Sequence, residues 1–225
     1  FLFGIYFFVF VFLLLKLNFF NSKIISKKTL VVFFIIKISI GVLLNLIYSN
    51  YYENRNTSDI FKYFDDSKFI HQSLHKNPIH FLRLLVGYND ESSDLDPYLD
   101  STMNWKSQSN VYSDLTNTSN NTFSNHNTIT KFNAIVRIFS FGNISIHVLF
   151  MCFLSLIGCL LVFKAYVNFI DASNIRLFTL FVFLFPSLLI WSSAVLKEGL
   201  LVFGFGIFIY SLFKISKCIF KLKYF

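Results

Sequence analysis

Long apolar runs alternate with polar stretches along this chain, and several runs approach the length that crosses a bilayer. A helix needs about 20 predominantly apolar residues to span the hydrocarbon core. The last run is short, at roughly 22 Å by helical rise. We therefore predict an all-α, polytopic transmembrane bundle of about five spans, at residues 1–20, 29–48, 144–163, 177–195 and 199–213.

The longest polar stretch separates the second apolar run from the third, and it divides the chain into regions 1–48, 49–141 and 142–225. In its first part, apolar residues at helical spacing are interrupted at Asn77-Pro78, which predicts two short helices near the membrane surface. Residues 88–127, rich in Asn, Ser, Thr and Asp, predict a loop. Residues 128–141 predict an amphipathic interfacial helix that leads into the third span.

The composition excludes an ordinary soluble domain. Hydrophobic residues make up 55% of the chain, charged residues only 14%, and the mean hydropathy is +0.58. Soluble domains carry about 25% charged residues. The three cysteines are scattered and form neither a zinc pattern nor a disulfide framework. The basic residues form no stripe, so no nucleic-acid partner is expected.

The placement of charge predicts how the chain crosses the membrane. Lys and Arg mark cytoplasmic loops, and with five spans the basic clusters between and after the spans all fall on one side. Region 49–141 holds 10 of the 12 acidic residues and is therefore expected to be extracytoplasmic. The chain opens at Phe1 and not at Met, and it ends directly after an apolar run. We therefore expect it to be a fragment of a longer polytopic protein.

Three acidic side chains in the segment TSDIFKYFDDS at 57–67 are the first candidate site: Asp59, Asp65 and Asp66. Carboxylates at the outer membrane surface can act as a general base on an acceptor hydroxyl, or hold a divalent cation against a phosphate. The alternative is solvated charge on an amphipathic helix, paired with Lys62 and Lys68. Adjacent helical residues differ by about 100°, so at most one of the neighbouring aspartates is expected on the buried side. Asp59 is expected to precede the helix, and the alternative to a catalytic role for it is to cap that helix.

The second candidate is Lys197-Glu198, which lies between two apolar runs. Charges there are costly unless they are paired or face water or protein. The pair forms either a charged turn of a helical hairpin or a site for an anionic headgroup. Pro186 in the preceding run is expected to end or kink its helix. The glycines that follow, Gly199, Gly204 and Gly206, are expected to allow close helix packing.

Basic residues near the outer interface, Arg83, Lys131 and Arg137, are the third candidate, because Arg binds phosphate bidentately. The alternative for these residues is that they snorkel to the membrane surface. Lys37 lies within an apolar run and is a functional candidate by default, although a snorkelling lysine is the other interpretation. The sequence contains no HExxH motif, and no protein metal site is predicted.

Three segments taken together resemble a known group of proteins: TSDIFKYFDDS at 57–67, KFNAIVR at 131–137, and FPS…WSS…LKEG at 185–199. They resemble polytopic membrane proteins of the Bacteroidetes type, some of which are similar to GT-C-like, polyprenyl-phosphate-sugar-dependent glycosyltransferases and exopolysaccharide polymerases. In that group the acidic loop usually follows the first span, whereas here it follows the second visible run.

The resemblance implies roles for particular residues. Asp59, Asp65 or Asp66 would be the base or would hold a divalent cation, the one cofactor that it suggests. The lipid phosphate would be bound from among Arg83, Arg137 and Lys197, with Glu198 beside them. The implied protein transfers or polymerises sugars from a polyprenyl-phosphate donor at the outer face of a bacterial inner membrane. The alternative is a non-enzymatic scaffold or assembly subunit of the cell envelope.

Overall fold

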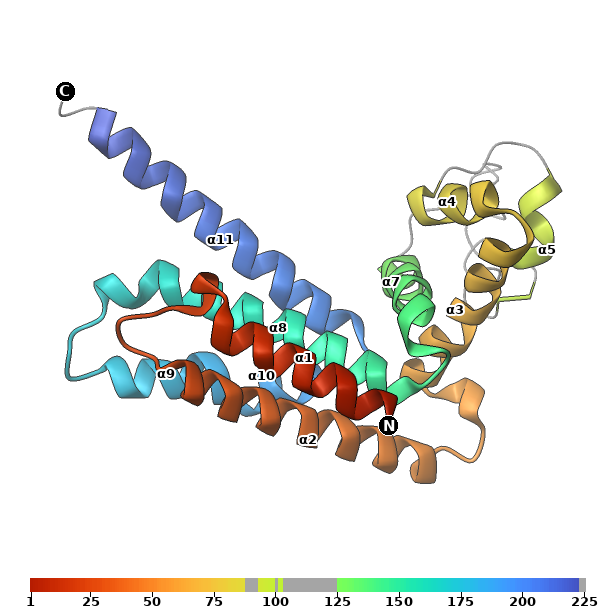
Figure 1. Cartoon of the computed structure of the whole chain (residues 1–225), viewed down its shortest axis with the longest axis horizontal. Helices are drawn as coiled ribbons and strands as arrows, with labels where there is room; N and C mark the ends of the chain where they lie inside the picture. The colour runs from red at the N-terminus through yellow and green to blue at the C-terminus, as the bar shows by residue number, and fades with distance from the viewer. Residues whose placement is uncertain (88–92, 100, 103–124, 223–225) are drawn as a thin grey trace, which may run out of the picture. The chain divides into compact units, whose positions relative to one another are not determined.

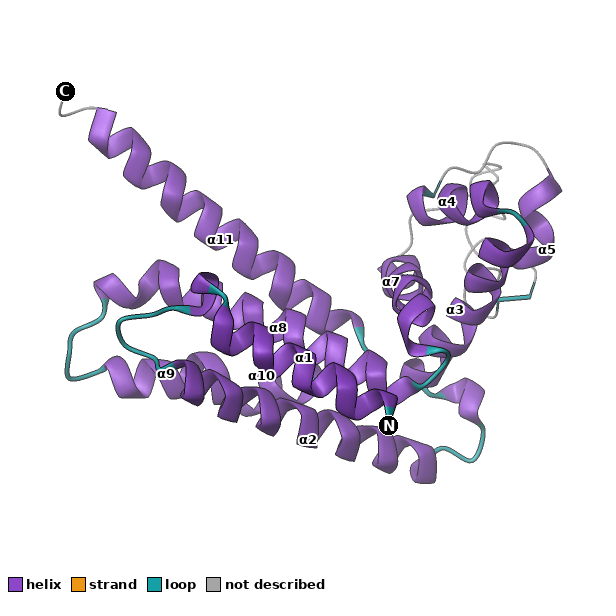
Figure 2. Ribbon diagram, in the orientation of Figure 1, coloured by secondary structure: helices purple, strands orange, loops and turns teal. Residues whose placement is uncertain are grey.

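The computed structural model describes residues 1–87, 93–99, 101–102 and 125–222, and every regular element in these ranges is helical (Figures 1 and 2). The predicted all-α class is confirmed for this part of the chain. The α-helices are α1 (Leu2–Lys16), α2 (Lys27–Tyr51), α3 (Asp59–Lys76), α4 (Pro78–Val86), α5 (Asp96–Leu99), α7 (Asn125–Ser140), α8 (Ile144–Tyr166), α9 (Ile175–Leu184), α10 (Pro186–Trp191) and α11 (Lys197–Leu222).

Among the described residues, three helical segments are long and apolar enough to cross a membrane: Lys27–Tyr51, Ile144–Phe169 and Lys197–Lys217. The first and fourth predicted spans are represented by shorter apolar helices, Leu2–Lys16 and Ile175–Trp191. These three candidate membrane-spanning helices in the described ranges indicate a membrane protein, and the count of about five spans stays a prediction. The last helix is longer than expected because α11 continues well beyond Phe213.

Pro186 divides the fourth predicted span, as expected. Helix α9 ends at Leu184, Phe185 leaves the helical conformation, and Pro186 begins α10 at a first-turn position. A proline has no backbone donor and disfavours helical geometry in the residue before it. The prediction that Pro186 ends or kinks its helix is confirmed.

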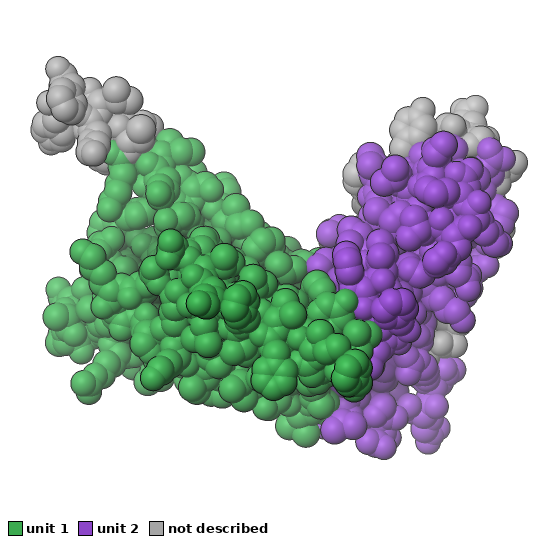
Figure 3. All heavy atoms as spheres, viewed as in Figure 1, with its two compact units in different colours: residues 1–44, 148–194, 198–225 green, residues 45–147, 195–197 purple. Residues whose placement is uncertain are grey.

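The chain divides into two compact units, coloured separately in Figure 3. Unit 1 comprises Phe1–Leu44, Val148–Ala194 and Glu198–Phe225, and unit 2 comprises Asn45–His147 with Val195–Lys197. Lys197 and Glu198, expected to act together, thus fall on either side of this division. Both lie in the first turn of α11, so the interpretation of the pair as a hairpin turn is wrong. The non-helical link lies before them, at residues 192–196.

Unit 1 is a bundle of apolar helices held together by aromatic rings. Phe10 of α1 stacks on Phe153 of α8, with ring centroids 4.5 Å apart. Phe33 of α2 stacks on Phe183 of α9 at 4.8 Å. The abundant phenylalanines therefore serve as the contacts between helices, where ring pairs add stability beyond the area they bury.

Helices α8 and α11 cross at glycines. A Cβ atom added to Gly206 would lie 2.3 Å from the carbonyl oxygen of Gly158. One added to Gly199 would lie 2.3 Å from the Met151 sulfur, whereas Gly204 has no neighbour within 4 Å. The packing role predicted for the glycines is confirmed for Gly199 and Gly206 and is wrong for Gly204.

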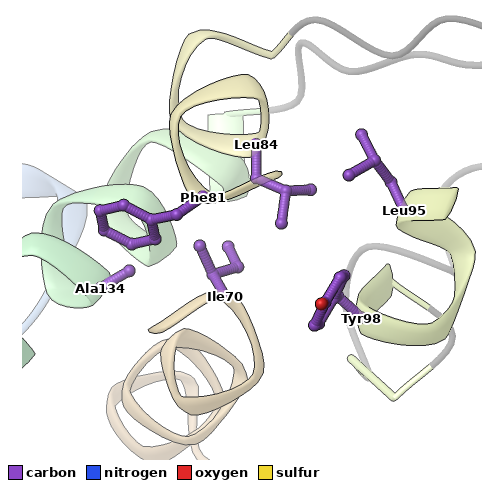
Figure 4. Packing of buried hydrophobic residues seen from close by; sticks show 6 residues of the cluster. All are labelled: Ile70, Phe81, Leu84, Leu95, Tyr98 and Ala134. Carbon is purple, nitrogen blue, oxygen red and sulfur yellow. The ribbon is translucent and has the colours of Figure 1, made fainter. Parts of the chain in front are cut away.

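Unit 2 is built on the amphipathic helix α3, which packs against α7 and α4. The Asn77 side chain accepts a hydrogen bond from the Ile79 amide at 3.0 Å and Pro78 begins α4, so the predicted break there is confirmed. The predicted interfacial helix is α7, which begins at Asn125. Most of the predicted loop 88–127 lies outside the described residues, but its described part includes the short helix α5. Figure 4 shows the hydrophobic core of unit 2, which is formed by Ile70, Phe81, Leu84, Leu95, Tyr98 and Ala134.

The crossing of α8 and α11 can be tested with two glycines of one helix. We expect Gly206→Leu to lower the free energy of unfolding by about 1–3 kcal/mol or more, because overpacking at a backbone contact forces the helices apart. Gly204→Leu is the matched control, since it adds the same side chain in open space. Unfolding in detergent measures both variants, and equal losses would contradict the crossing.

Candidate functional site

A cavity of about 390 Å³ in unit 2 carries a basic lining, and we call it the basic cavity. Four of its lining side chains are, or can become, cations. No carboxylate belongs to this lining, as far as the described residues go. The lining consists of Lys68, His71, Gln72, Leu74 and His75 of α3, Arg137 and Ile138 of α7, and Phe141 and Gly142 of the turn that follows.

Helical periodicity brings the α3 side chains into the cavity together. Positions 68, 71, 72 and 75 are separated by three or four residues, which places them on one face of a helix. The opposite face of α3 carries apolar residues that pack in unit 2, among them Tyr63 and Ile70. Burial of that apolar face therefore directs the basic face toward the cavity.

Arg137 joins α7 to α3 and is only 8% exposed. Its Nε donates to the Ser67 hydroxyl at 3.1 Å, and its Nη2 donates to the Phe64 carbonyl oxygen at 2.6 Å. The guanidinium carbon also lies 4.2 Å from the centroid of the Phe64 ring. These contacts fix the plane of the guanidinium group.

One amino group of Arg137 remains available for a ligand. In the described part of the chain, Nη1 has no hydrogen-bond acceptor, while the residue lines the basic cavity. A Cβ atom on Gly142 would lie 3.1 Å from Nη1, and Gly142 has a φ of +80°. Glycine at this position therefore suits the left-handed backbone and leaves room beside the guanidinium group.

A buried chain of hydrogen bonds anchors the turn that forms the cavity wall. The His147 ring is bonded through Nε2 to the Ser140 hydroxyl at 2.8 Å and through Nδ1 to the Asn133 side-chain oxygen at 2.9 Å. The Ser140 hydroxyl oxygen also accepts from the Gly142 amide at 3.3 Å. Ser140 and His147 resemble a nucleophile and its base, but both are fully buried. Their role is to position the turn.

The cavity's electrostatics favour an anion. Burial is the main cause that lowers the pKa of Arg137; the charge of Asp65 raises it and that of Arg55 lowers it. Arginine stays charged in spite of such shifts. Burial also lowers the pKa of His71 below its ordinary value of 6.5, helped by His75 and Arg137. A bound anion would oppose this effect, because it stabilises the protonated ring.

The three candidate aspartates lie in different surroundings on α3. Asp59 is exposed and lies 3.8 Å from Lys62, whereas Asp66 is 3% exposed. Asp65 accepts from Arg55 at 2.6 and 3.1 Å. The prediction that at most one of the adjacent aspartates is buried is confirmed. The capping prediction for Asp59 is wrong, because Ser58 is the N-cap and Asp59 is the first helical residue.

None of these aspartates lines the basic cavity. None lines the second cavity either, which has a volume of about 600 Å³ and is lined by apolar residues of α8 to α11 in unit 1. Asp65 is nevertheless close enough to Arg137 for its charge to stabilise the guanidinium form. A divalent cation does not fit the basic cavity, because its lining is cationic and the lining residues of the described structure offer no carboxylate ligand.

The remaining predicted residues do not meet at either cavity. Arg83 is half-buried on α4, and Lys197 and Glu198 are half-buried at the start of α11. Of the residues singled out from the sequence as substrate-binding, Arg137 alone lines the basic cavity. Sequence reasoning missed Lys68, His71, Gln72 and His75 as one surface, although their spacing of three and four residues was visible in the sequence.

Comparisons with known proteins identify no relative of this chain. No family model matches it, and neither a curated protein nor a solved structure is similar to it.

The depressed pKa of His71 predicts that anion binding depends on pH. We expect inorganic sulfate, whose charge is constant across the range, to bind more tightly as the pH falls below about 6.5, because His71 then gains a proton. Calorimetric titration of the detergent-solubilised protein measures this dependence. His71→Gln should weaken the pH dependence of sulfate binding. His80→Gln should preserve it, because His80 lies outside the cavity lining. A pH profile that His71→Gln leaves unchanged would contradict the assignment.

Proposed function

We propose that this membrane protein binds the phosphate group of a lipid-linked substrate in the basic cavity and belongs functionally with lipid-linked-sugar glycosyltransferases or polysaccharide polymerases. The observation that carries the proposal is the cavity lining, which combines a fixed guanidinium group with Lys68 and two histidines and contains no carboxylate among the described residues. A guanidinium group with a free amino end matches the geometry of a phosphate.

The neighbourhood of the cavity in the chain supports a lipid as the source of that phosphate. Phe141 and Gly142, which form one wall, come directly before the candidate span Ile144–Phe169. Residues just outside a span lie at the level of the lipid headgroups. The exposed apolar side chains of Ile138 and Phe141 are suited to contact the apolar part of such a substrate.

The topology belongs to the same proposal. In it, the two shorter apolar helices complete a set of about five spans, region 49–141 faces the outside, and the membrane is a bacterial inner membrane. The support for this orientation is the placement of Lys and Arg in the short loops and of most acidic residues in region 49–141.

Asp65 is the best-supported catalytic base of this proposed transferase. It lies within electrostatic reach of Arg137, and it is partly exposed, so an acceptor hydroxyl can approach it. Asp66 is buried, which favours a structural role.

A second candidate function is a non-enzymatic scaffold in the cell envelope. It is favoured by the ion pairs of Asp59 with Lys62 and of Asp65 with Arg55, which are the ordinary contacts of a solvated helix face. In this case the basic cavity would bind a membrane phospholipid as an anchor and would carry out no reaction.

Binding of a polyprenyl phosphate is the first test of the proposal. Losing one charge-assisted hydrogen bond costs about 1.5–3 kcal/mol, so Lys68→Gln should weaken binding roughly 10- to 100-fold. Lys62→Gln is the matched control, because Lys62 lies on the same helix outside the cavity lining. Titration of undecaprenyl phosphate into the 225-residue protein in nanodiscs measures the affinity. Equal effects of both variants would overturn the cavity as the binding site.

Sugar transfer separates the enzyme from the scaffold. We expect Asp65→Asn to reduce transfer from a polyprenyl-phosphate sugar by 100-fold or more, on the order of a lost general base, while polyprenyl phosphate binding is retained. Asp59→Asn is the control, as its carboxylate is exposed at the helix start. Release of product from a radiolabelled donor measures the reaction. Binding without any transfer by the unmodified protein would favour the scaffold.

A further inference from the structure

The second cavity lies within unit 1, and we call it the apolar cavity. Its volume of about 600 Å³ falls within the range of pockets that hold small ligands, about 300–1,000 Å³. Helices α8, α9, α10 and α11 all contribute to its lining. In the described part of the chain, no side chain of this lining carries a charge, an amide or a hydroxyl group. The cavity therefore suits a ligand that is itself apolar.

Two backbone features of the sequence form the walls of the apolar cavity. Pro186 ends α9, and Phe185, which leaves the helical conformation at this break, lines the cavity. On the other side α8 and α11 meet backbone to backbone, because a Cβ atom on Gly158 would lie 2.3 Å from the Val202 carbonyl oxygen. Cys159 and Val202, at this crossing, also line the cavity. The walls are therefore set by the backbone and not by side-chain rotamers alone.

The apolar cavity has a buried floor and an exposed rim. Cys159 and Val182 form the floor and are 3% and 7% exposed. Phe181, Leu201 and Phe205 form the rim and are 57–62% exposed. The cavity therefore reaches into the bundle of unit 1 and opens at its surface.

The surroundings of this opening are those of a membrane helix. Helices α8 and α11, which contribute to the walls, belong to candidate membrane-spanning segments. The medium outside the opening is therefore lipid hydrocarbon. Water does not suit the cavity, since an ordered water needs two to four polar partners. An empty space of this volume is also unfavourable, because its lining would lose dispersion contacts.

A second protein helix is too wide to fill the cavity. One helical turn is about 10–12 Å wide and 5.4 Å long, so it occupies roughly 400–600 Å³. The cavity holds about one such turn, whereas a membrane span has about 20 residues. A single hydrocarbon chain is narrower and flexible, so it can reach the floor. The lining has no polar group with which to select among such chains, so mass action favours the most concentrated one, the acyl chain of a phospholipid.

We propose that the apolar cavity binds one acyl chain of a membrane phospholipid, whose headgroup lies outside the cavity. The chain restores the dispersion contacts of the lining and so stabilises the packing of α9 and α10 with α11. This inference is independent of the proposed function, because it involves only unit 1.

Phospholipid binding to the delipidated 225-residue protein in detergent tests the proposal, with native mass spectrometry counting the bound molecules. One dioleoyl phosphatidylcholine should bind, and dioleoyl phosphatidylglycerol should bind equally well, because the headgroup makes no contact in the cavity. Dihexanoyl phosphatidylcholine should bind far more weakly, since each buried methylene strengthens binding roughly fourfold. A clear preference for one headgroup, or binding that is independent of chain length, would overturn the proposal.

Matched variants of α11 locate the site. Leu201→Trp should weaken dioleoyl phosphatidylcholine binding by about tenfold or more, because the indole overpacks the mouth of the cavity. Leu212→Trp is the control, since Leu212 is exposed on the same helix and lies outside the cavity lining. If Leu201→Trp does not fold, Val162→Phe fills the cavity from α8 and should cause the same loss.

Three further results would overturn the proposal. The first is equal binding by the Leu201→Trp and Leu212→Trp proteins. The second is tighter binding of undecaprenyl phosphate that Leu201→Trp abolishes, because the occupant would then be an isoprenoid chain. The third is a dimer in light scattering that Leu201→Trp dissociates, because a second copy would then cover the cavity. Sulfate binding to these variants should stay unchanged, which separates a failure here from a failure of the proposed function.

Discussion

The hydrogen bonds of one buried guanidinium group join α7 to α3 in unit 2 and shape the basic cavity beside them. Arg137 binds the Phe64 carbonyl oxygen and the Ser67 hydroxyl across the interface of α7 and α3. Burying this charge is tolerable because oxygen acceptors and an aromatic face replace its water. The other consequences follow from this constraint: α3 presents its basic face beside Arg137, and the turn at Gly142 must leave space for the guanidinium group.

Unit 1 meets the same physical problem in a membrane setting. Lys37 of α2 is the buried basic residue there, and its Nζ donates to the Ser192 hydroxyl just after α10. In both units a long basic side chain donates to a serine hydroxyl from another segment of the chain, Arg137 to Ser67 and Lys37 to Ser192. The hydrogen bond between the two groups lowers two costs at once: the cost of burying the charge and the cost of leaving a buried acceptor unpaired. Each buried basic side chain therefore links two separate segments of its unit.

The two buried cations differ in what they leave open. Arg137 keeps one amino group directed at a cavity, and that cavity is lined by other basic groups, so the site is prepared for an anion. Lys37 is buried in unit 1, bonded to Ser192, and lines neither of the two cavities. Burial alone would not separate these roles. The separation rests on whether the side chain lines an open volume.

The sequence by itself determined the helical class, the membrane character and several local boundaries. Some features act only on residues close to them in the chain, so their effects can be predicted from the sequence alone. These are Pro186, Asn77-Pro78 and the long apolar runs. Only the tertiary structure decided which polar residues meet. Asp65 and Asp66 are adjacent, yet one pairs with Arg55 and the other is buried, whereas Lys37 meets Ser192 across 155 positions. Such pairings depend on how helices pack, and helix packing brings together residues that no spacing in the sequence connects.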